Sequence, residues 1–349
     1  MHDRRMSCTT RGSRRGAPAI LTAVVLAIAL WAAVPHLAHV TSAVAAAAGD
    51  QDARVAFTLK DTRVSESSGL ATSRVHPGIV YTHNDSEGSA RFFAIGEKGR
   101  TLATYTVAGA QARDWEAVAV GPGPAGEPAI YLADIGDNLG GAWPSISVYR
   151  LPEPRQLHDA VVQADRLRFT YADGPRNAEA LLVHPGTGRV YIASKEDRGS
   201  LYVAPENPST TETNTLRRVA PAPSRVTGGA FAPDGDSFVL RTYFSAHLYT
   251  APGEQVARLP LPLQPQGESV AYTSNGRALL VSSEGAHTEV WRVPLPGKSP
   301  NASPEPEGTA TTKAAPGGSP ANTTNIAFVL IAIAVTVLAA GLWRRRRRG

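Results

Sequence analysis

The chain has 349 residues, of which 42% are hydrophobic, 19% charged and 7% aromatic, with one Cys, and this composition excludes a disordered chain, a coiled coil and a disulfide scaffold. The formal net charge of +5 comes from the two ends, since Arg4, Arg5, Arg11, Arg14 and Arg15 lie at one and Arg344–Arg348 at the other. The middle of the chain is mildly acidic and lacks the clustered cations of a nucleic-acid-binding surface, so no nucleic-acid partner is predicted.

Residues 1–48 are predicted to be a signal peptide. Basic residues precede the apolar run 17–34, and small residues follow it at 42–48. Cleavage would fall after Ala45 or Ala48, although the length of the apolar run also fits an uncleaved anchor. Cleavage would remove Cys8, which would exclude thiolate catalysis, cysteine metal sites and disulfides from the mature chain.

The C-terminal residues are predicted to anchor the protein in a membrane. Residues 298–325 are rich in Pro, Ser, Thr, Ala and Gly and form a linker that cannot bury a core. Residues 326–343 are apolar or small over a length that spans a bilayer as a helix, and the basic tail 344–349 places the C-terminus in the cytoplasm. We therefore expect a single-pass protein of the cell membrane with an extracellular domain at 49–297.

The extracellular domain is predicted to be all-β, because short runs of Val, Tyr, Phe and Ile alternate with Gly, Pro, Asn and Asp turns. One pattern of four strands recurs about every 40 to 50 residues, as in propeller blades. Its first strands are predicted at 68–72, 116–120, 179–183, 229–233 and 268–272. Second strands follow at 79–85, 130–134, 190–196, 238–242 and 278–284, and third strands at 92–95, 146–150, 200–203, 247–250 and 289–293.

The last repeat lacks a fourth strand, because Pro294 and the linker follow its third strand at once. The isolated N-terminal strand at 54–59 can supply it and join the two ends of the ring. The sequence therefore predicts a β-propeller of five blades closed by the N-terminal strand. A sixth, degenerate blade in the long interval between the second and third repeats and an ordinary β-sandwich are the alternatives.

Several phrases of the sequence resemble secreted bacterial β-propeller proteins of the WD40-like, NHL-like or esterase-like phytase type. They are Ser67-Ser-Gly-Leu-Ala71, His83-Asn-Asp85, Asp114-Trp-Glu116, Asp134-Ile-Gly-Asp-Asn138 and Asn177-Ala-Glu179. The resemblance covers residues 54–296 and implies the propeller fold. It assigns no catalytic residue, because the Trp-Asp dipeptide of a true WD40 repeat and the calcium motifs of the phytases are absent.

In a propeller, the starts of the first strands and the ends of the second strands meet at one mouth of the central channel. Glu116, Glu179 and Glu268 are predicted to ring this mouth. Beside them we expect Asp85, Asp134, Asp137, Glu196, Glu284, His83, Asn84, Asn138, Lys195 and Arg241. Carboxylates packed so closely repel unless they share protons, pair with cations or bind a metal, and oxygen ligands suit calcium or magnesium. Hydrogen bonds that join the blades, and catalysis, are the other roles open to the three Glu.

The segment Asp134-Ile-Gly-Asp-Asn138 is the best candidate for a calcium loop, with Asp134, Asp137, Glu116 and Glu179 as the metal ligands. The alternative is an Asx turn with Gly136 at positive φ.

The function predicted from these features is a membrane-tethered extracellular module that binds a small molecule or a protein at an acidic mouth, with a divalent cation, calcium, as the cofactor. The ligand-binding residues would be Glu116, Glu179, Glu268, His83, Lys195 and Arg241. One alternative is a metal-dependent hydrolase of phosphate or carboxylic esters, in which Lys195 or Arg241 holds the leaving oxyanion. Another is a scaffold that binds partners through its outer strands.

Overall fold

The structure is a computed structural model that describes residues 53–85 and 89–297. Their backbone forms 21 strands joined by turns, and no helix occurs among them. The prediction of an all-β domain is therefore confirmed. No described segment is a helix of the length and hydropathy needed to cross a bilayer. The predicted signal peptide, linker, transmembrane helix and basic tail lie outside the described residues.

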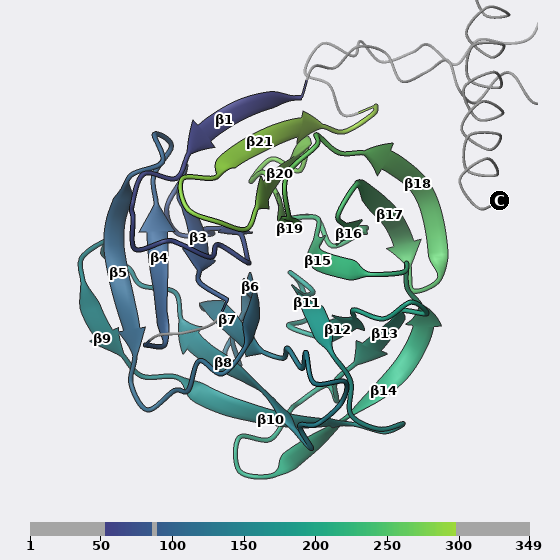
Figure 1. Ribbon diagram of the computed structural model, residues 1–349. Helices are drawn as coiled ribbons and strands as arrows, with labels where there is room; N and C mark the ends of the chain where they lie inside the picture. Colours follow the sequence, from purple (N-terminus) through teal and green to yellow (C-terminus); the bar gives the residue numbers. More distant parts are fainter. Residues whose placement is uncertain (1–52, 86–88, 298–349) are drawn as a thin grey trace, which may run out of the picture. The chain divides into compact units, whose positions relative to one another are not determined.

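Five strands begin the repeats that the sequence predicts, and all five are short and largely buried. In Figure 1, the labelled ones among them lie around a common centre, with the remaining strands of each sheet stacked outward. We refer to these five as the inner strands: β2 (Ala71–Thr72), β6 (Trp115–Pro122), β11 (Ala178–Val183), β15 (Val226–Phe231) and β19 (Gly267–Tyr272).

Two sheets extend outward from β2 and β15. The first has the order β2-β3-β4-β5-β9, and the second has the order β15-β16-β17-β18. Their outer strands are β3 (Val80–His83), β4 (Arg91–Ile95), β5 (Thr101–Val107), β9 (Ala160–Val162), β16 (Phe238–Thr242), β17 (Ser245–Ala251) and β18 (Glu254–Pro260). All neighbours are antiparallel except β5 and β9, which are parallel.

A third sheet has eight strands in the order β11-β12-β13-β14-β10-β8-β7-β6. It consists of two antiparallel halves that are joined at their outer edges by parallel pairing of β10 with β14. Because β6 and β11 at the two ends of this order also lie against each other, the sheet curls back and is nearly closed. Its other strands are β7 (Pro128–Asp134), β8 (Ile146–Pro152), β10 (Asp165–Tyr171), β12 (Val190–Ser194), β13 (Ser200–Val203) and β14 (Thr213–Pro221).

The fourth sheet joins the two ends of the described chain. Its order is β19-β20-β21-β1, with β20 at Ala278–Ser283, β21 at Glu289–Pro294 and β1 at Arg54–Thr58. β1 pairs antiparallel with β21, from Arg54 opposite Arg292 to Thr58 opposite Glu289. The N-terminal strand thus supplies the strand that the last repeat lacks, and Figure 1 shows it beside β21.

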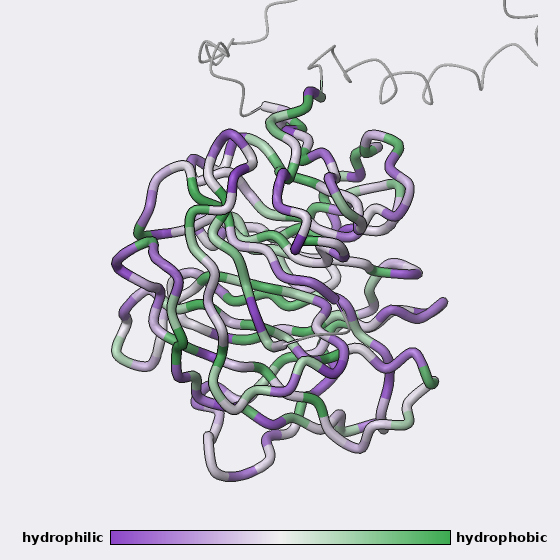
Figure 2. The backbone as a smooth tube through the Cα atoms, turned by 60° about the vertical axis from the view of Figure 1, so that its left-hand side comes forward, coloured by the Kyte–Doolittle hydropathy of each residue, from purple (hydrophilic) through white to green (hydrophobic). Residues whose placement is uncertain are grey.

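The core consists of five apolar clusters, and each cluster lies between two neighbouring groups of four strands. Aromatic side chains stack within some of them, as where Phe92 stacks on Tyr105 at 4.8 Å and Phe238 on Tyr249 at 4.9 Å between ring centroids. Figure 2 shows apolar residues along the strands and hydrophilic ones in many of the loops. Since one cluster connects β19–β21 back to β2–β5, the apolar packing continues around the whole ring.

Candidate functional site

Four of the inner strands contain a β-bulge at the same place, near their start. The pairing of β6 with β7 skips Glu116, that of β11 with β12 skips Glu179, and that of β19 with β20 skips Glu268. In β15 the skipped residue is Thr227, whose hydroxyl donates to the carbonyl of Gly267 at 2.9 Å. A bulge turns one extra side chain out of the regular alternation. The three predicted Glu thus occupy equivalent, buried positions.

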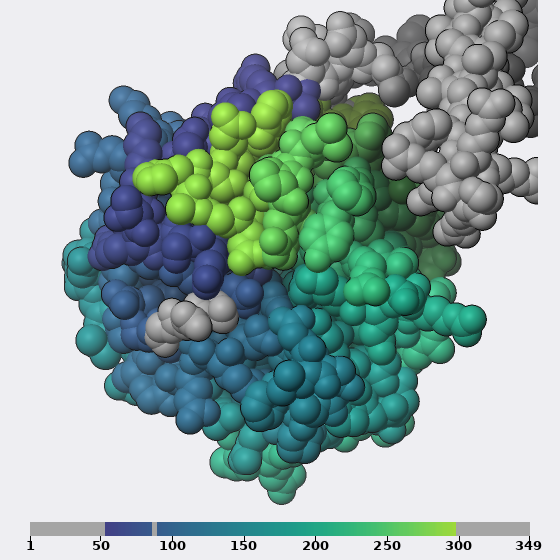
Figure 3. Space-filling view, in the orientation of Figure 1, coloured from purple at the N-terminus to yellow at the C-terminus, as the bar shows by residue number. Residues whose placement is uncertain are grey.

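Six carboxylates lie together at this end of the inner strands, and we call them the acidic mouth: Asp85, Asp114, Glu116, Glu179, Glu268 and Glu284. Each of the three Glu is at most 3% exposed, and the charges of the six act on one another. In the space-filling view, parts of the chain that are far apart in sequence meet at the centre of the molecule (Figure 3). The structure thus brings together Glu116, Glu179 and Glu268, as the repeat pattern predicts.

Asp85, Asp114 and Glu116 form the tightest group within the acidic mouth. One carboxylate oxygen of each lies within 4.8 Å of the others. Gly136 closes the group from the side, because a Cβ there would lie 2.4 Å from Cγ of Asp114 and 2.6 Å from Oε1 of Glu116. The φ of Gly136 is not among the positive values, so the positive φ expected for it in the Asx-turn alternative is wrong, although Asp137 does accept the i+2 hydrogen bond of an Asx turn from Leu139. Its missing side chain instead makes room for two carboxylates.

Burial and mutual repulsion raise the pKa values of several carboxyl groups in the acidic mouth. Burial raises the pKa of Asp85 to about 8, and the facing Asp114 carboxylate adds to this effect. Burial likewise raises the pKa of Glu116 well above its ordinary value, assisted by Glu179, and that of Glu284 to about 7, assisted by Glu268. These groups repel one another once they ionise, so they require protons or a bound cation at neutral pH.

Lys195 is the one cation paired directly with the acidic mouth among the described residues. Its Nζ donates to Oε1 of Glu179 and lies 5.3 Å from the centroid of the Tyr243 ring. Burial acts to lower the pKa of Lys195, but the charge of Glu179 outweighs it and the pKa is raised. Burial raises the pKa of Glu179 to about 8, although Lys195 acts in the opposite direction. Oε2 of Glu179 has no hydrogen-bond partner in the described part of the chain.

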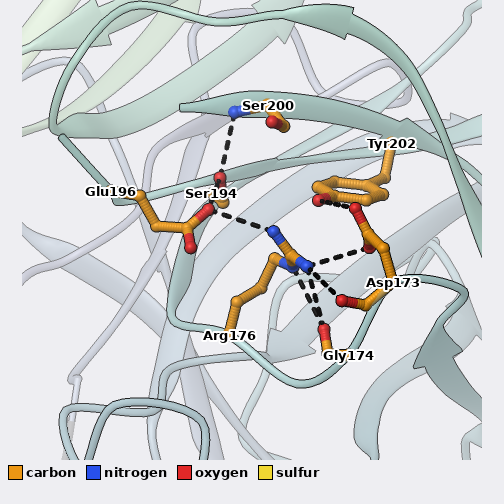
Figure 4. Close-up of polar contacts among 7 residues, drawn as sticks. All are labelled: Asp173, Gly174, Arg176, Ser194, Glu196, Ser200 and Tyr202. Atoms are coloured by element: carbon orange, nitrogen blue, oxygen red, sulfur yellow. Dashed lines mark hydrogen bonds and ion pairs between the residues drawn. The ribbon is translucent and has the colours of Figure 1, made fainter. Parts of the chain in front are cut away.

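A second network holds the turn that presents Lys195 (Figure 4). The guanidinium of Arg176 pairs with Glu196 at 3.2 Å and with Asp173 at 2.9 Å, and Glu196 also accepts from the hydroxyl of Ser194 at 2.7 Å. Glu196, which the sequence places beside the mouth, is thus engaged in this network. Because Ser194 and Glu196 flank Lys195, their contacts fix the backbone that directs the lysine toward Glu179.

Asp134 and Asp137, the two predicted calcium ligands of the loop, bind the backbone. Oδ1 of Asp134 accepts from the N–H of Asp114 at 3.0 Å, and Nε of Arg113 lies 3.6 Å from it. The two oxygens of Asp137 accept from the N–H groups of Leu139 at 3.3 Å and Trp143 at 2.8 Å. The segment therefore positions Asp114 and its own loop by hydrogen bonds.

His83 and Arg241, two predicted ligand-binding residues, are fully buried. Nδ1 of His83 donates to the carbonyl of Asn84 at 3.0 Å, and burial lowers the pKa of this imidazole to about 4. Arg241 donates to the carbonyls of Ser269 and Ser282, the latter at 2.8 Å, and to Oε1 of Gln264 at 2.6 Å. Arg241 therefore links β16 to β19 and β20 and is directed into the protein.

Asp114 is the member of the tight group that the sequence analysis does not assign. It lies two residues before Glu116, in the phrase Asp114-Trp-Glu116 at the start of an inner strand. This spacing is the signal that could have found it.

A comparison with models of known protein families gives no match, and a comparison with curated protein sequences gives no significant match.

Proposed function

We propose that this domain is a five-bladed β-propeller that binds a divalent cation, and through it an anionic ligand or protein partner, at the acidic mouth. The observation that carries the proposal is the group of Asp85, Asp114 and Glu116, whose oxygens face one another within 4.8 Å. The unpaired Oε2 of the buried Glu179 supports it independently. A cation would reduce the repulsion that raises the pKa values of the group and of the neighbouring Glu179.

Calcium fits the chemistry of these residues. All of the candidate ligands are carboxylate oxygens, which hard cations prefer, and the described mouth contributes no thiolate or imidazole to the group. Three carboxylates provide only part of the roughly six to eight oxygens that calcium takes. The remaining positions would be open to water or to oxygens of a ligand, which is how the cation would recruit an anionic partner.

The membrane anchor predicted at 326–343 and the signal peptide predicted at 1–48 give the proposal its setting: the acidic mouth would be displayed outside the cell on the linker 298–325. A binding role suits a tethered domain. The hydrolase alternative gains no support from the geometry, because Arg241 donates to backbone carbonyls and Lys195 pairs with Glu179, so neither is directed at a leaving oxyanion.

The test is thermal unfolding of the full chain in chelator and then in millimolar calcium or magnesium, followed by tryptophan fluorescence. A ligand at about 100 times its Kd stabilises the folded state by about 2.7 kcal/mol. For a domain of this size, that raises Tm by about 5–10 °C. We expect the shift in the wild type and in Asp197→Asn, whose side chain is 80% exposed, and its loss in Asp114→Asn. An equal shift in Asp114→Asn, or none in the wild type, would contradict the proposal.

A further inference from the structure

The other end of the inner strands forms a pocket of about 360 Å³, which apolar side chains and polar groups line together. Each inner strand contributes apolar side chains to this pocket, and β6, β11 and β19 carry a Glu near the opposite end, where β15 has Thr227. The residues that represent them in the lining are Ala71, Val118, Val183, Phe231 and Ala271. Small-molecule sites have this character: apolar walls, a volume in this range and a few polar groups that fix the ligand's orientation.

Arg74 is the only charged residue in the described lining of the pocket. It follows β2, and its Nη1 donates to the carbonyl of Pro185, which follows β11, at 3.1 Å. Because β6 lies between β2 and β11 in the ring, this hydrogen bond joins two pocket-lining segments on either side of β6. The guanidinium therefore lies where a ligand in the pocket would present its polar end.

The polar groups around Arg74 leave the positive charge of its guanidinium available to a ligand. Nε and Nη2 of the guanidinium have no acceptor among the described residues, and the side chain is exposed. The nearby Glu153 carboxylate accepts from the hydroxyl of Ser73 at 2.5 Å and from that of Tyr81 at 3.1 Å, and is itself buried. The hydroxyl of Thr72 donates to the carbonyl of Tyr272 at 2.6 Å. A guanidinium with two free donors is the group that binds a carboxylate in a bidentate manner.

We propose that this pocket binds a linear apolar molecule that carries one carboxylate, with the hydrocarbon chain between the inner strands and the carboxylate on Arg74. The single cation matches a single negative charge, and the apolar side chains that the inner strands contribute would contact the hydrocarbon. The site lies at the opposite end of the inner strands from the acidic mouth and rests on none of its residues. It stands or falls separately from the cation-binding function.

The test is photolabelling of the full chain in lipid nanodiscs with a diazirine derivative of decanoate, followed by mapping of the labelled peptides. Label is expected on the peptides that contain Val183 and Phe231. Unlabelled decanoate should compete, and decyltrimethylammonium should not. Arg74→Gln should lower the labelling at least about tenfold, as expected for the loss of a charge-assisted hydrogen bond. The matched Arg217→Gln, at an exposed position of β14, should label like the wild type.

Two further variants separate binding from folding. Ala119→Phe would fill the pocket from β6 and should abolish the labelling, while Glu179→Gln at the acidic mouth should leave it unchanged. Arg74 is exposed, so its replacement by Gln leaves the core intact even if Ala119→Phe fails to fold. Labelling of the pocket that survives Arg74→Gln, equal competition by the ammonium compound, or an unlabelled pocket would overturn the proposal. An unlabelled pocket would overturn the proposal even if a segment of the chain itself occupies the pocket.

Discussion

Replacing Asp85 with Asn should stabilise the metal-free protein at neutral pH. In the folded state the pKa of Asp85 is raised from 3.8 to about 8, so the folded state binds a proton that the unfolded state releases between these pH values. Stability is then greatest below pH 4 and falls as pH rises toward 8. An Asn cannot ionise, and its amide can donate to the facing Asp114 in place of the proton.

The magnitude follows from the same pKa. One proton bound only in the folded state changes the free energy of unfolding by about 1.4 kcal/mol per pH unit. At pH 7 the upper limit for Asp85 is about 4 kcal/mol, and because the side chain keeps partial contact with water we expect about 2 kcal/mol. The pKa of Glu284, about 7, and that of Glu116 are also raised, so these groups change the stability in the same direction. The free energy of unfolding of the wild type should therefore decrease over this pH window by more than one titrating proton accounts for.

The assay is urea unfolding of the full chain in chelator at several pH values from about 5 to 8. We expect the wild type to become less stable with rising pH, and Asp85→Asn to show a slope smaller by about one proton. Asp197→Asn, an exposed Asp in an ion pair with Arg225, should keep the slope of the wild type. If Asp85→Asn keeps that slope too, burial does not hold Asp85 protonated and the reasoning fails.

Three other changes have outcomes that the structure fixes. Arg241→Met should lower the free energy of unfolding by about 3–5 kcal/mol, because it leaves several buried acceptors without donors. Denaturant unfolding measures this change. A loss below about 1 kcal/mol would argue against a structural role for the buried hydrogen bonds of Arg241. Gly136→Ala should abolish the calcium-dependent rise in Tm by displacing Asp114, and an unchanged rise would place the cation elsewhere. Lys195→Met leaves Glu179 without its cation. The free energy of unfolding of this variant should therefore decrease more between pH 5 and pH 8 than that of the wild type. Parallel pH profiles of the two proteins would count against the ion pair.

The sequence by itself determined where the strands lie. The short apolar runs and the turns between them place the inner strands within a few residues of their observed bounds, because turn residues end a strand and short apolar runs between turns favour buried strands. The repeat also placed Glu116, Glu179 and Glu268 at equivalent positions, since equivalent residues of a repeat occupy equivalent places. The missing last strand indicated the pairing of 54–58 with β21.

Only the tertiary structure decided what those residues contact. A bulge at each Glu, the burial of Arg241 among carbonyls of β19 and β20, and the use of Asp137 to bind backbone N–H groups depend on neighbours far apart in the chain. The group of Asp85, Asp114 and Glu116 joins the start of one inner strand to the loop after β3, which no local pattern specifies. Burial sets the charges of these groups, and burial is a property of the packed sheets.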